Sequence, residues 1–361
     1  MKYSLQVGRP FGIKISIHWT FLLLIIWIVA VNVNQGVNTS QILWSVFFIL
    51  VLFVCVTLHE LGHSLAARRY DVETKSITLL PIGGMANIEG MPEKPKQELV
   101  VTLSGLAVNV VIAGILWVII STVPAYSFDI DLTTINSKNF LVMLMYVNLF
   151  IVAFNLIPAF PMDGGRVLRA ALSFRFDKVK ATKYSMIAGQ IFGAFFAIVG
   201  LFINPFLFII GVFVFLGAQF EYKQVKYRSL LFDYKAKDII MEDYSILDPD
   251  DDLKKAVDVL LNTRQTGFLV KKEDEFVGLL LKDHIIDGLS KYGEEGKVSN
   301  AMQKNYKRID ANTFLRDIFQ SMQKEKTDMF PVFENEKLIG VIDQENIHEF
   351  IMVQSALHDD R

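Results

Sequence analysis

Long apolar runs in the first 220 residues constrain the fold of this chain more than any other feature. A helix needs about 20 consecutive apolar residues to cross the hydrocarbon core of a bilayer. Six segments meet or approach that length, and we expect each of them to be a transmembrane helix. They cover residues 15–33, 41–66, 99–121, 140–158, 185–203 and 205–220.

Composition separates these segments from the rest of the chain. Of the 361 residues 52% are hydrophobic, but residues 221–361 have the charged composition of a soluble domain. The sequence therefore predicts an α-helical polytopic membrane domain at 1–220, a basic and aromatic linker at 221–234, and a soluble domain at 235–361. The formal net charge of −2 gives no indication of a nucleic-acid partner.

The distribution of basic residues predicts the orientation in the membrane. The connections on one side of the six segments carry nearly all the Lys and Arg residues of the membrane domain, whereas those on the other side contain only Lys138. Basic connections stay in the cytosol. We therefore expect a multi-pass protein of the cell membrane, with both termini and the soluble domain in the cytosol.

Three polar residues interrupt the second apolar segment, "VLFVCVTLHELGHSLAARR" at 51–69. His59, Glu60 and His63 form the pattern H-E-x-x-H. On a helix, positions i and i+4 share a face, so both imidazoles can reach one ion, with the glutamate beside them. Ionisable groups inside a span are costly and usually functional, which favours a metal site over polar residues at a helix end.

A third ligand is expected in "NLIPAFPMDGGRVLRA" at 155–170. Prolines end the fourth apolar segment before Asp163, and Gly164 and Gly165 follow it, where they allow a backbone that bulky residues would not tolerate. Two histidines and a carboxylate, with one position left for water, form the ligand set of catalytic zinc. The alternative is that Asp163 only caps an amphipathic surface helix.

"HELGH" and "NLIPAFPMDGG", both on apolar segments, resemble the motifs of the site-2 proteases, which are intramembrane zinc metalloproteases. The resemblance implies that His59, His63 and Asp163 bind one Zn²⁺ ion. It implies that Glu60 is the catalytic acid and base and activates a zinc-bound water. It also implies that Asn155 holds the substrate carbonyl or its oxyanion.

A third segment, "SGLAVN" at 104–109, is similar to the G-P-x-x-N segment of the same family, with Leu106 where proline is usual. The resemblance implies regulated intramembrane proteolysis, in which the enzyme cleaves peptide bonds in or near the transmembrane segments of membrane-anchored proteins inside the lipid bilayer.

The segment "SITLLPIGGMANIEG" at 76–90 predicts a short membrane-associated β-hairpin, because β-branched residues flank a Pro and Gly turn signal. A substrate helix must unwind before it is cleaved, and its exposed backbone then needs hydrogen-bond partners. We expect this hairpin to pair with the extended substrate by strand addition. The alternative is an ordinary cytosolic hairpin.

The soluble domain contains an internal repeat at residues 236–353 with an offset of 62. "FLVKKEDEFVGLLLKDHI" at 268–285 aligns with "FPVFENEKLIGVIDQENI" at 330–347. Each unit reads as helix, strand, charged turn, strand and helix. The pair, at about 235–290 and 297–353, resembles tandem CBS domains, an α/β module that commonly senses adenine nucleotides and often dimerises.

The nucleotide signature of that family differs here. Leu281 and His284 occupy the positions of its Thr and Asp in the first copy, and Asp343 and Asn346 occupy them in the second. An adenine nucleotide therefore stays open as a ligand, beside a regulatory or substrate-docking role for the pair. A homodimer formed through the pair is a further expectation.

Two other functions fit parts of the sequence. One is an ion transporter or channel gated by the CBS pair, in which the His, Glu and Asp cluster binds the transported ion. Against it, the membrane domain has no evident inverted repeat, and Glu60 has no role in transport. The other is an inactive scaffold that keeps zinc only for folding.

Overall fold

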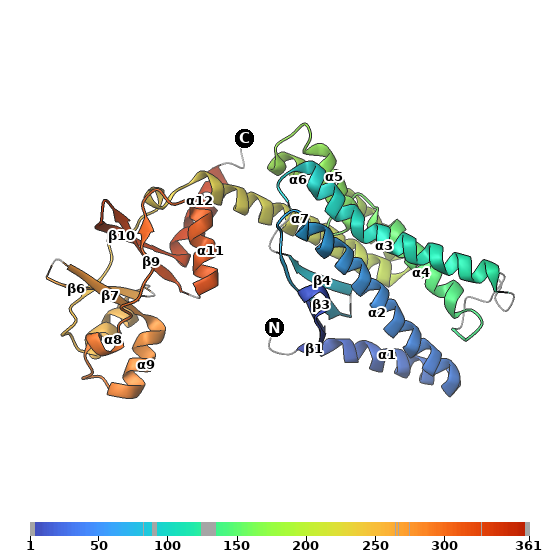
Figure 1. The fold of residues 1–361 in the computed structure, drawn as a ribbon, viewed down its shortest axis with the longest axis horizontal. Coiled ribbons are helices and arrows are strands. Elements are labelled where there is room, and N and C mark those ends of the chain that lie inside the picture. The colour runs from blue at the N-terminus through green and yellow to red at the C-terminus, as the bar shows by residue number, and fades with distance from the viewer. Residues whose placement is uncertain are drawn as a thin grey trace. The chain divides into compact units, whose positions relative to one another are not determined.

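The computed structural model describes residues 4–81, 83–88, 92–123, 135–263, 265, 267–273, 275–325 and 327–357. The chain divides into two compact units, Met1–Tyr222 and Lys223–Arg361 (Figure 1). In the described part of the first unit, long helices accompany one small sheet. The described residues of the second unit form two small sheets with short helices.

Seven α-helices begin in the described part of the first unit, and the last of them extends past its boundary. They are α1 Thr20–Asn34, α2 Thr39–Arg68, α3 Pro95–Thr122, α4 Phe140–Asn155, α5 Asp163–Leu172, α6 Lys178–Ile203 and α7 Pro205–Asp233. Local signals set where they start. The side chain of Asn38 accepts the N–H of Gln41 and caps α2. Pro95 and Pro205 are the first residues of their helices, where the missing N–H of proline costs nothing.

Four of these helices, α2, α3, α6 and α7, are long and apolar enough to cross a membrane. The prediction of six transmembrane helices is not confirmed, because α1 has 15 residues and α4 has 16, fewer than the roughly 20 that a span needs. The segment predicted at 15–33 is partly strand, since Lys14–His18 alternates polar and branched residues. The segment predicted at 140–158 ends as a helix at Asn155, shortly before Pro158.

The two strands of the predicted hairpin at 76–90 pair as expected, and they belong to a larger sheet than predicted. Residues 82, 89 and 90 of the prediction lie outside the described part of the chain. The strands are β1 Ser4–Gly8, β2 Lys14–His18, β3 Thr74–Leu80 and β4 Gly83–Ile88, in the order β1-β2-β3-β4. β3 pairs antiparallel with β4 and parallel with β2. Among the described strands, β4 pairs on one side only and is an edge of the sheet.

The second unit contains the two predicted repeats, each with a three-stranded sheet. The first repeat comprises β5 Ile246–Leu247, α8 Leu253–Asn262, β6 Gly267–Lys272, β7 Glu275–Leu281 and α9 Lys282–Tyr292. The second repeat comprises β8 Ile309–Asp310, α11 Leu315–Glu325, β9 Met329–Glu334, β10 Lys337–Asp343 and α12 Gln344–Leu357. A short helix, α10 Val298–Ala301, precedes the second sheet. The sheet orders β5-β6-β7 and β10-β9-β8 have the same pairing pattern. Each long strand of the second repeat starts 62 residues after its counterpart, as Gly267 and Met329 show.

The segment predicted as a linker, 221–234, is helical as far as Asp233. Leu230 and Leu231 near its end are buried in the hydrophobic core of the second repeat, with Phe330 and Ile342. This end of α7 is therefore part of the packed second unit.

A buried ion cluster joins three helices of the first unit. Arg169 of α5 is 1% exposed, and its guanidinium lies 2.6 Å from the carboxylate of Glu98 on α3 and 2.9 Å from that of Glu221 on α7. The same guanidinium lies over the ring of Phe160, 5.1 Å from its centroid. Since Asp163 is the first residue of α5, this cluster holds in place the helix that carries it.

Replacement of Arg169 by Met should destabilise the protein strongly, because it leaves the buried carboxylate of Glu98 unpaired. Breaking a buried pair in this way costs about 3–5 kcal/mol. Lys180→Met is the matched control: Lys180 pairs with Asp177 at 3.6 Å, and both side chains are more than half exposed, so its loss costs about 0–1 kcal/mol. Thermal unfolding of the two variants in detergent measures the difference, and equal midpoints would contradict the role of the cluster.

Candidate metal centre and active site

The two histidines of H-E-x-x-H lie on one face of α2 and are buried. His59 is 6% exposed and His63 is 3% exposed. Their Nε2 atoms are 3.1 Å apart. The spacing of four residues therefore places both imidazoles at one point, as the sequence predicts.

Asp163, the first residue of α5, meets the histidines from a distant part of the chain. Its Oδ2 atom lies 3.1 Å from Nε2 of His63 and 3.3 Å from Nε2 of His59. Its other oxygen faces Arg166, whose guanidinium is 4.0 Å away. The structure thus gathers all three predicted metal-binding residues into one buried cluster.

The chemistry of these three atoms fits a zinc ion. Nδ1 of His63 lies 2.8 Å from the carbonyl oxygen of Val101, which can only accept, so this nitrogen carries the proton and Nε2 has a free lone pair. Nδ1 of His59 lies 2.7 Å from Oδ1 of Asn109 in the same way. Tetrahedral zinc with ligands at about 2.0–2.1 Å would separate them by about 3.3 Å. The observed triangle, with sides of 3.1 to 3.3 Å, has the size of such a ligand set.

The two glycines after Asp163 have a different purpose from the one predicted. Neither has a positive φ, and both lie in the first turn of α5. A Cβ atom on Gly164 would collide with the carbonyl oxygen of Ile157, and one on Gly165 would lie 2.6 Å from the backbone nitrogen of Phe160. They are required because the start of α5 packs directly on the turn that follows α4.

Glu60 is not one of the three converging groups. It lies next to them on α2 and packs against the sheet: a Cβ atom on Gly84 of β4 would lie 2.7 Å from Cγ of Glu60. Glu60 therefore lies beside the two histidines on α2 and in contact with the edge strand β4.

Asn155 is the last residue of α4, and its Nδ2 donates to the carbonyl of Ile151 at 3.0 Å. Its role towards a substrate oxyanion stays a prediction. His18 lies in β2, where Nδ1 is 2.8 Å from the hydroxyl of Thr20, and it is not part of the cluster. Three residues at the site were not predicted from the sequence: Arg166, Asn109, which faces His59, and Asn148, which faces Asn109. Two buried asparagines in apolar helices, Asn109 and Asn148, were the available signal.

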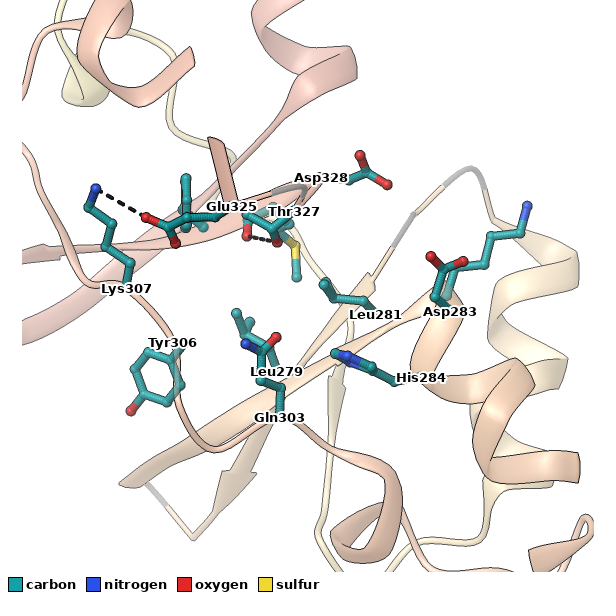
Figure 2. Close-up of a pocket in the computed structure, with 13 residues that line it drawn as sticks. Leu279, Leu281, Asp283, His284, Gln303, Tyr306, Lys307, Glu325, Thr327 and Asp328 are labelled. Atoms are coloured by element: carbon teal, nitrogen blue, oxygen red, sulfur yellow. Dashed lines mark hydrogen bonds and ion pairs between the residues drawn. The ribbon is translucent and has the colours of Figure 1, made fainter. Parts of the chain in front are cut away.

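The second unit contains a separate cavity of about 230 Å³, shown in Figure 2. It is lined by both repeats and by the segment between them, and Lys307 and Glu325 form an ion pair at its wall. Leu281 and His284, which occupy the signature positions of the first copy, both line it. This cavity is the candidate ligand site of the repeat pair.

The signature positions of the second copy are used for local structure. Oδ1 of Asp343 accepts the N–H of Asn346 at 2.7 Å, which caps the start of α12. Burial raises the pKa of the Asp343 carboxyl above its ordinary value. This carboxylate is therefore occupied by the backbone of its own helix.

Comparison with known proteins gives a consistent result for both units. Residues 47–200 match the model of peptidase family M50, and residues 236–291 and 298–353 each match that of the CBS domain. The chain is 35% identical to zinc metalloprotease MJ0392 of Methanocaldococcus jannaschii over 348 residues, which are 96% of each chain. It is 28% identical to stage IV sporulation protein FB of Bacillus subtilis over 203 residues, 54% of this chain and 66% of that one. A solved structure, the site-2 protease from Methanocaldococcus jannaschii, covers 61% of this chain and 95% of its own with 34% identity and a TM-score of 0.46.

The cluster and the neighbouring glutamate define a zinc-dependent hydrolase in a bundle of apolar helices. The chain belongs to peptidase family M50, the site-2 proteases, and carries two CBS domains after the protease domain. It is accordingly a metalloendopeptidase of a membrane protein family.

Gly105 on α3 provides a direct test of the metal centre. A Cβ atom there would collide with the ring of His63, whereas one on Gly114 of the same helix would have no neighbour within 4 Å among the residues that the structure describes. Gly105→Ala should therefore displace the His63 imidazole and lower the zinc content of the purified protein by about tenfold or more. Gly114→Ala is the control and should retain zinc; elemental analysis measures both. Full zinc occupancy in Gly105→Ala would contradict the arrangement.

Proposed function

We propose that this protein carries out regulated intramembrane proteolysis, cleaving peptide bonds in or near the transmembrane segments of membrane-anchored proteins. The observation that carries the proposal is the convergence of His59, His63 and Asp163 on one point beside helices long and apolar enough to span a bilayer. A soluble protease would have no reason to place its metal ligands there, because polar groups inside a membrane span are costly.

The residues of the cluster divide the chemistry between them. His59, His63 and Asp163 hold the ion, and a bound zinc ion supplies Lewis acidity and lowers the pKa of water. Glu60 takes the proton of the attacking water and passes it to the nitrogen of the departing amine. Asn155 stabilises the charge that develops on the carbonyl oxygen of the substrate.

Glu60→Gln separates catalysis from metal binding. The amide keeps the shape of the side chain but cannot accept a proton, so cleavage should fall by about 10²–10⁴-fold while zinc content stays that of the wild type. The measurement is the accumulation of uncut precursor when either form is co-expressed with candidate single-span proteins. Unchanged cleavage would show that Glu60 is not the base, and a wild-type protein that contains zinc but cleaves nothing would favour a structural metal.

The edge strand β4 supports a mode of substrate binding. Gly84 of β4 packs on Glu60, and β4 is an edge of the described sheet. A strand added at this edge would therefore run close to Glu60. An unwound substrate segment in a membrane needs partners for its backbone N–H and C=O groups. Strand addition to β4 would supply them and hold the scissile bond near the cluster.

Cysteine cross-linking tests this mode, and the chain suits it because Cys55 is its only cysteine. Met85 of β4 is 45% exposed and is the position for a new thiol. In a Cys55→Ala, Glu60→Gln background, Met85→Cys should form disulfides with a substrate that carries a single cysteine at successive positions. Alternate substrate positions should react, because side chains of a strand alternate between its faces. A repeat of three to four residues would indicate a bound helix and contradict strand addition.

The distribution of Lys and Arg residues supports an orientation in which both termini and the CBS pair are cytosolic, and the cleavage site lies near the cytosolic face. Accessibility of introduced cysteines to an impermeant reagent in intact cells measures it. Labelling of the CBS pair from outside the cell would contradict it.

The CBS pair would regulate cleavage or dock the substrate, and it would be the surface through which two copies associate. The charged cavity in Figure 2 offers a place for a small ligand. Leu281 and His284 lack the hydroxyl and carboxylate with which the family contacts a nucleotide. Titration of the purified protein with AMP and ATP distinguishes the roles. Asp328 lines this cavity, and nucleotide binding that is lost in Asp328→Ala would identify a nucleotide regulator. Absence of nucleotide binding to the wild type would favour docking.

A further inference from the structure

Two buried asparagine side chains connect His59 on α2 to helix α4 by hydrogen bonds. Nδ1 of His59 meets Oδ1 of Asn109 on α3 at 2.7 Å. Nδ2 of Asn109 donates to Oδ1 of Asn148 on α4 at 2.8 Å, and Nδ2 of Asn148 donates to the carbonyl of Leu144 at 2.8 Å. Both asparagines are completely buried.

The last member of this chain determines its direction. The carbonyl of Leu144 can only accept a hydrogen bond, so Asn148 must turn its NH₂ group towards it. The oxygen of Asn148 then faces Asn109, which must turn its own NH₂ group to meet it. The oxygen of Asn109 is left for His59. An acceptor at that position requires the proton of His59 on Nδ1, which leaves the lone pair of Nε2 for a metal.

We propose that Asn148 is a positioning residue of the zinc site: acting through Asn109, it holds His59 in the tautomer that binds metal. The inference rests on the proposed role of His59 as a zinc ligand, and it adds a residue that touches neither metal nor substrate. His63 needs no such device, because its Nδ1 already faces a backbone carbonyl, that of Val101. Partners of this kind fix the orientation and tautomer of metal-binding histidines, and their loss typically costs about 10–100-fold in metal affinity.

Zinc affinity of the full-length protein in detergent, measured by competition with a chelator, tests the proposal without depending on cleavage. Asn148→Leu keeps the branching of the side chain at Cγ but removes the group that orients Asn109, and it should weaken zinc binding about tenfold. Thr102→Val is the matched control. Thr102 lies on α3 and, like Asn148, is completely buried. Its hydroxyl has no hydrogen-bond partner among the described residues, so Thr102→Val should leave the zinc affinity unchanged.

A second substitution separates orientation from packing. Asn109→Asp replaces the amide by a carboxylate, and either of its oxygens can accept a hydrogen bond from His59. While Asn148 is present, the second carboxylate oxygen faces the oxygen of Asn148, which is also an acceptor. The double variant Asn109→Asp, Asn148→Leu removes that conflict. It should bind zinc more tightly than either single variant and recover most of the wild-type affinity.

Four outcomes would overturn the inference. Asn148→Leu could bind zinc as tightly as the wild type, or the double variant could bind no better than the single variants. If Asn148→Leu does not fold, Asn109→Asp decides alone, because its second carboxylate oxygen faces the oxygen of Asn148, and a zinc affinity equal to that of the wild type would count against the proposal. A wild-type protein that binds no zinc would instead overturn the proposed function and, with it, this inference.

Discussion

Three acceptor atoms within 3.3 Å of one another, held inside a bundle of apolar helices, are the constraint on which the rest of this structure depends. Two imidazole lone pairs and a carboxylate oxygen repel one another, and their burial costs free energy unless a cation collects them. When a divalent ion is bound, the same burial strengthens its attraction to the carboxylate, because the surroundings have a low dielectric constant. Metal binding and the stability of the helix bundle are therefore coupled.

Helix α3 supports this centre in two ways. It supplies the acceptors for both histidines, from Val101 and Asn109, and it approaches α2 closely enough that Gly105 contacts the ring of His63. In a membrane the lipid does not drive helices together, so close packing through small residues and buried hydrogen bonds takes over that role. The first turn of the same helix also contains Glu98, which pairs with Arg169 of α5. The metal centre and the packing of the membrane helices thus use the same contacts.

Much of this site could be predicted because its signals are local. The spacing of His59 and His63 is a property of one helix, and the CBS repeats are read from an offset that the strand boundaries reproduce. The sheet could be predicted only in part. Strand β2 lies inside an apolar run, and it pairs with β3, which follows only after α1 and α2 in the sequence. The cluster around Arg169 and the orientation of Asn148 could not be predicted, because their partners come from segments far apart in the sequence. The glycines after Asp163 were predicted for their conformational freedom, but they are needed for close packing, which only tertiary contacts reveal.

X-ray absorption at the zinc edge of the purified, active, full-length protein tests the central claim most directly. One zinc ion per chain is expected, with two imidazole nitrogens and oxygen ligands at about 2.0–2.2 Å, and Asp163→Ala should change the oxygen contribution while both imidazoles remain. An active preparation without zinc, or a zinc ion bound by fewer than two imidazoles, would contradict the account.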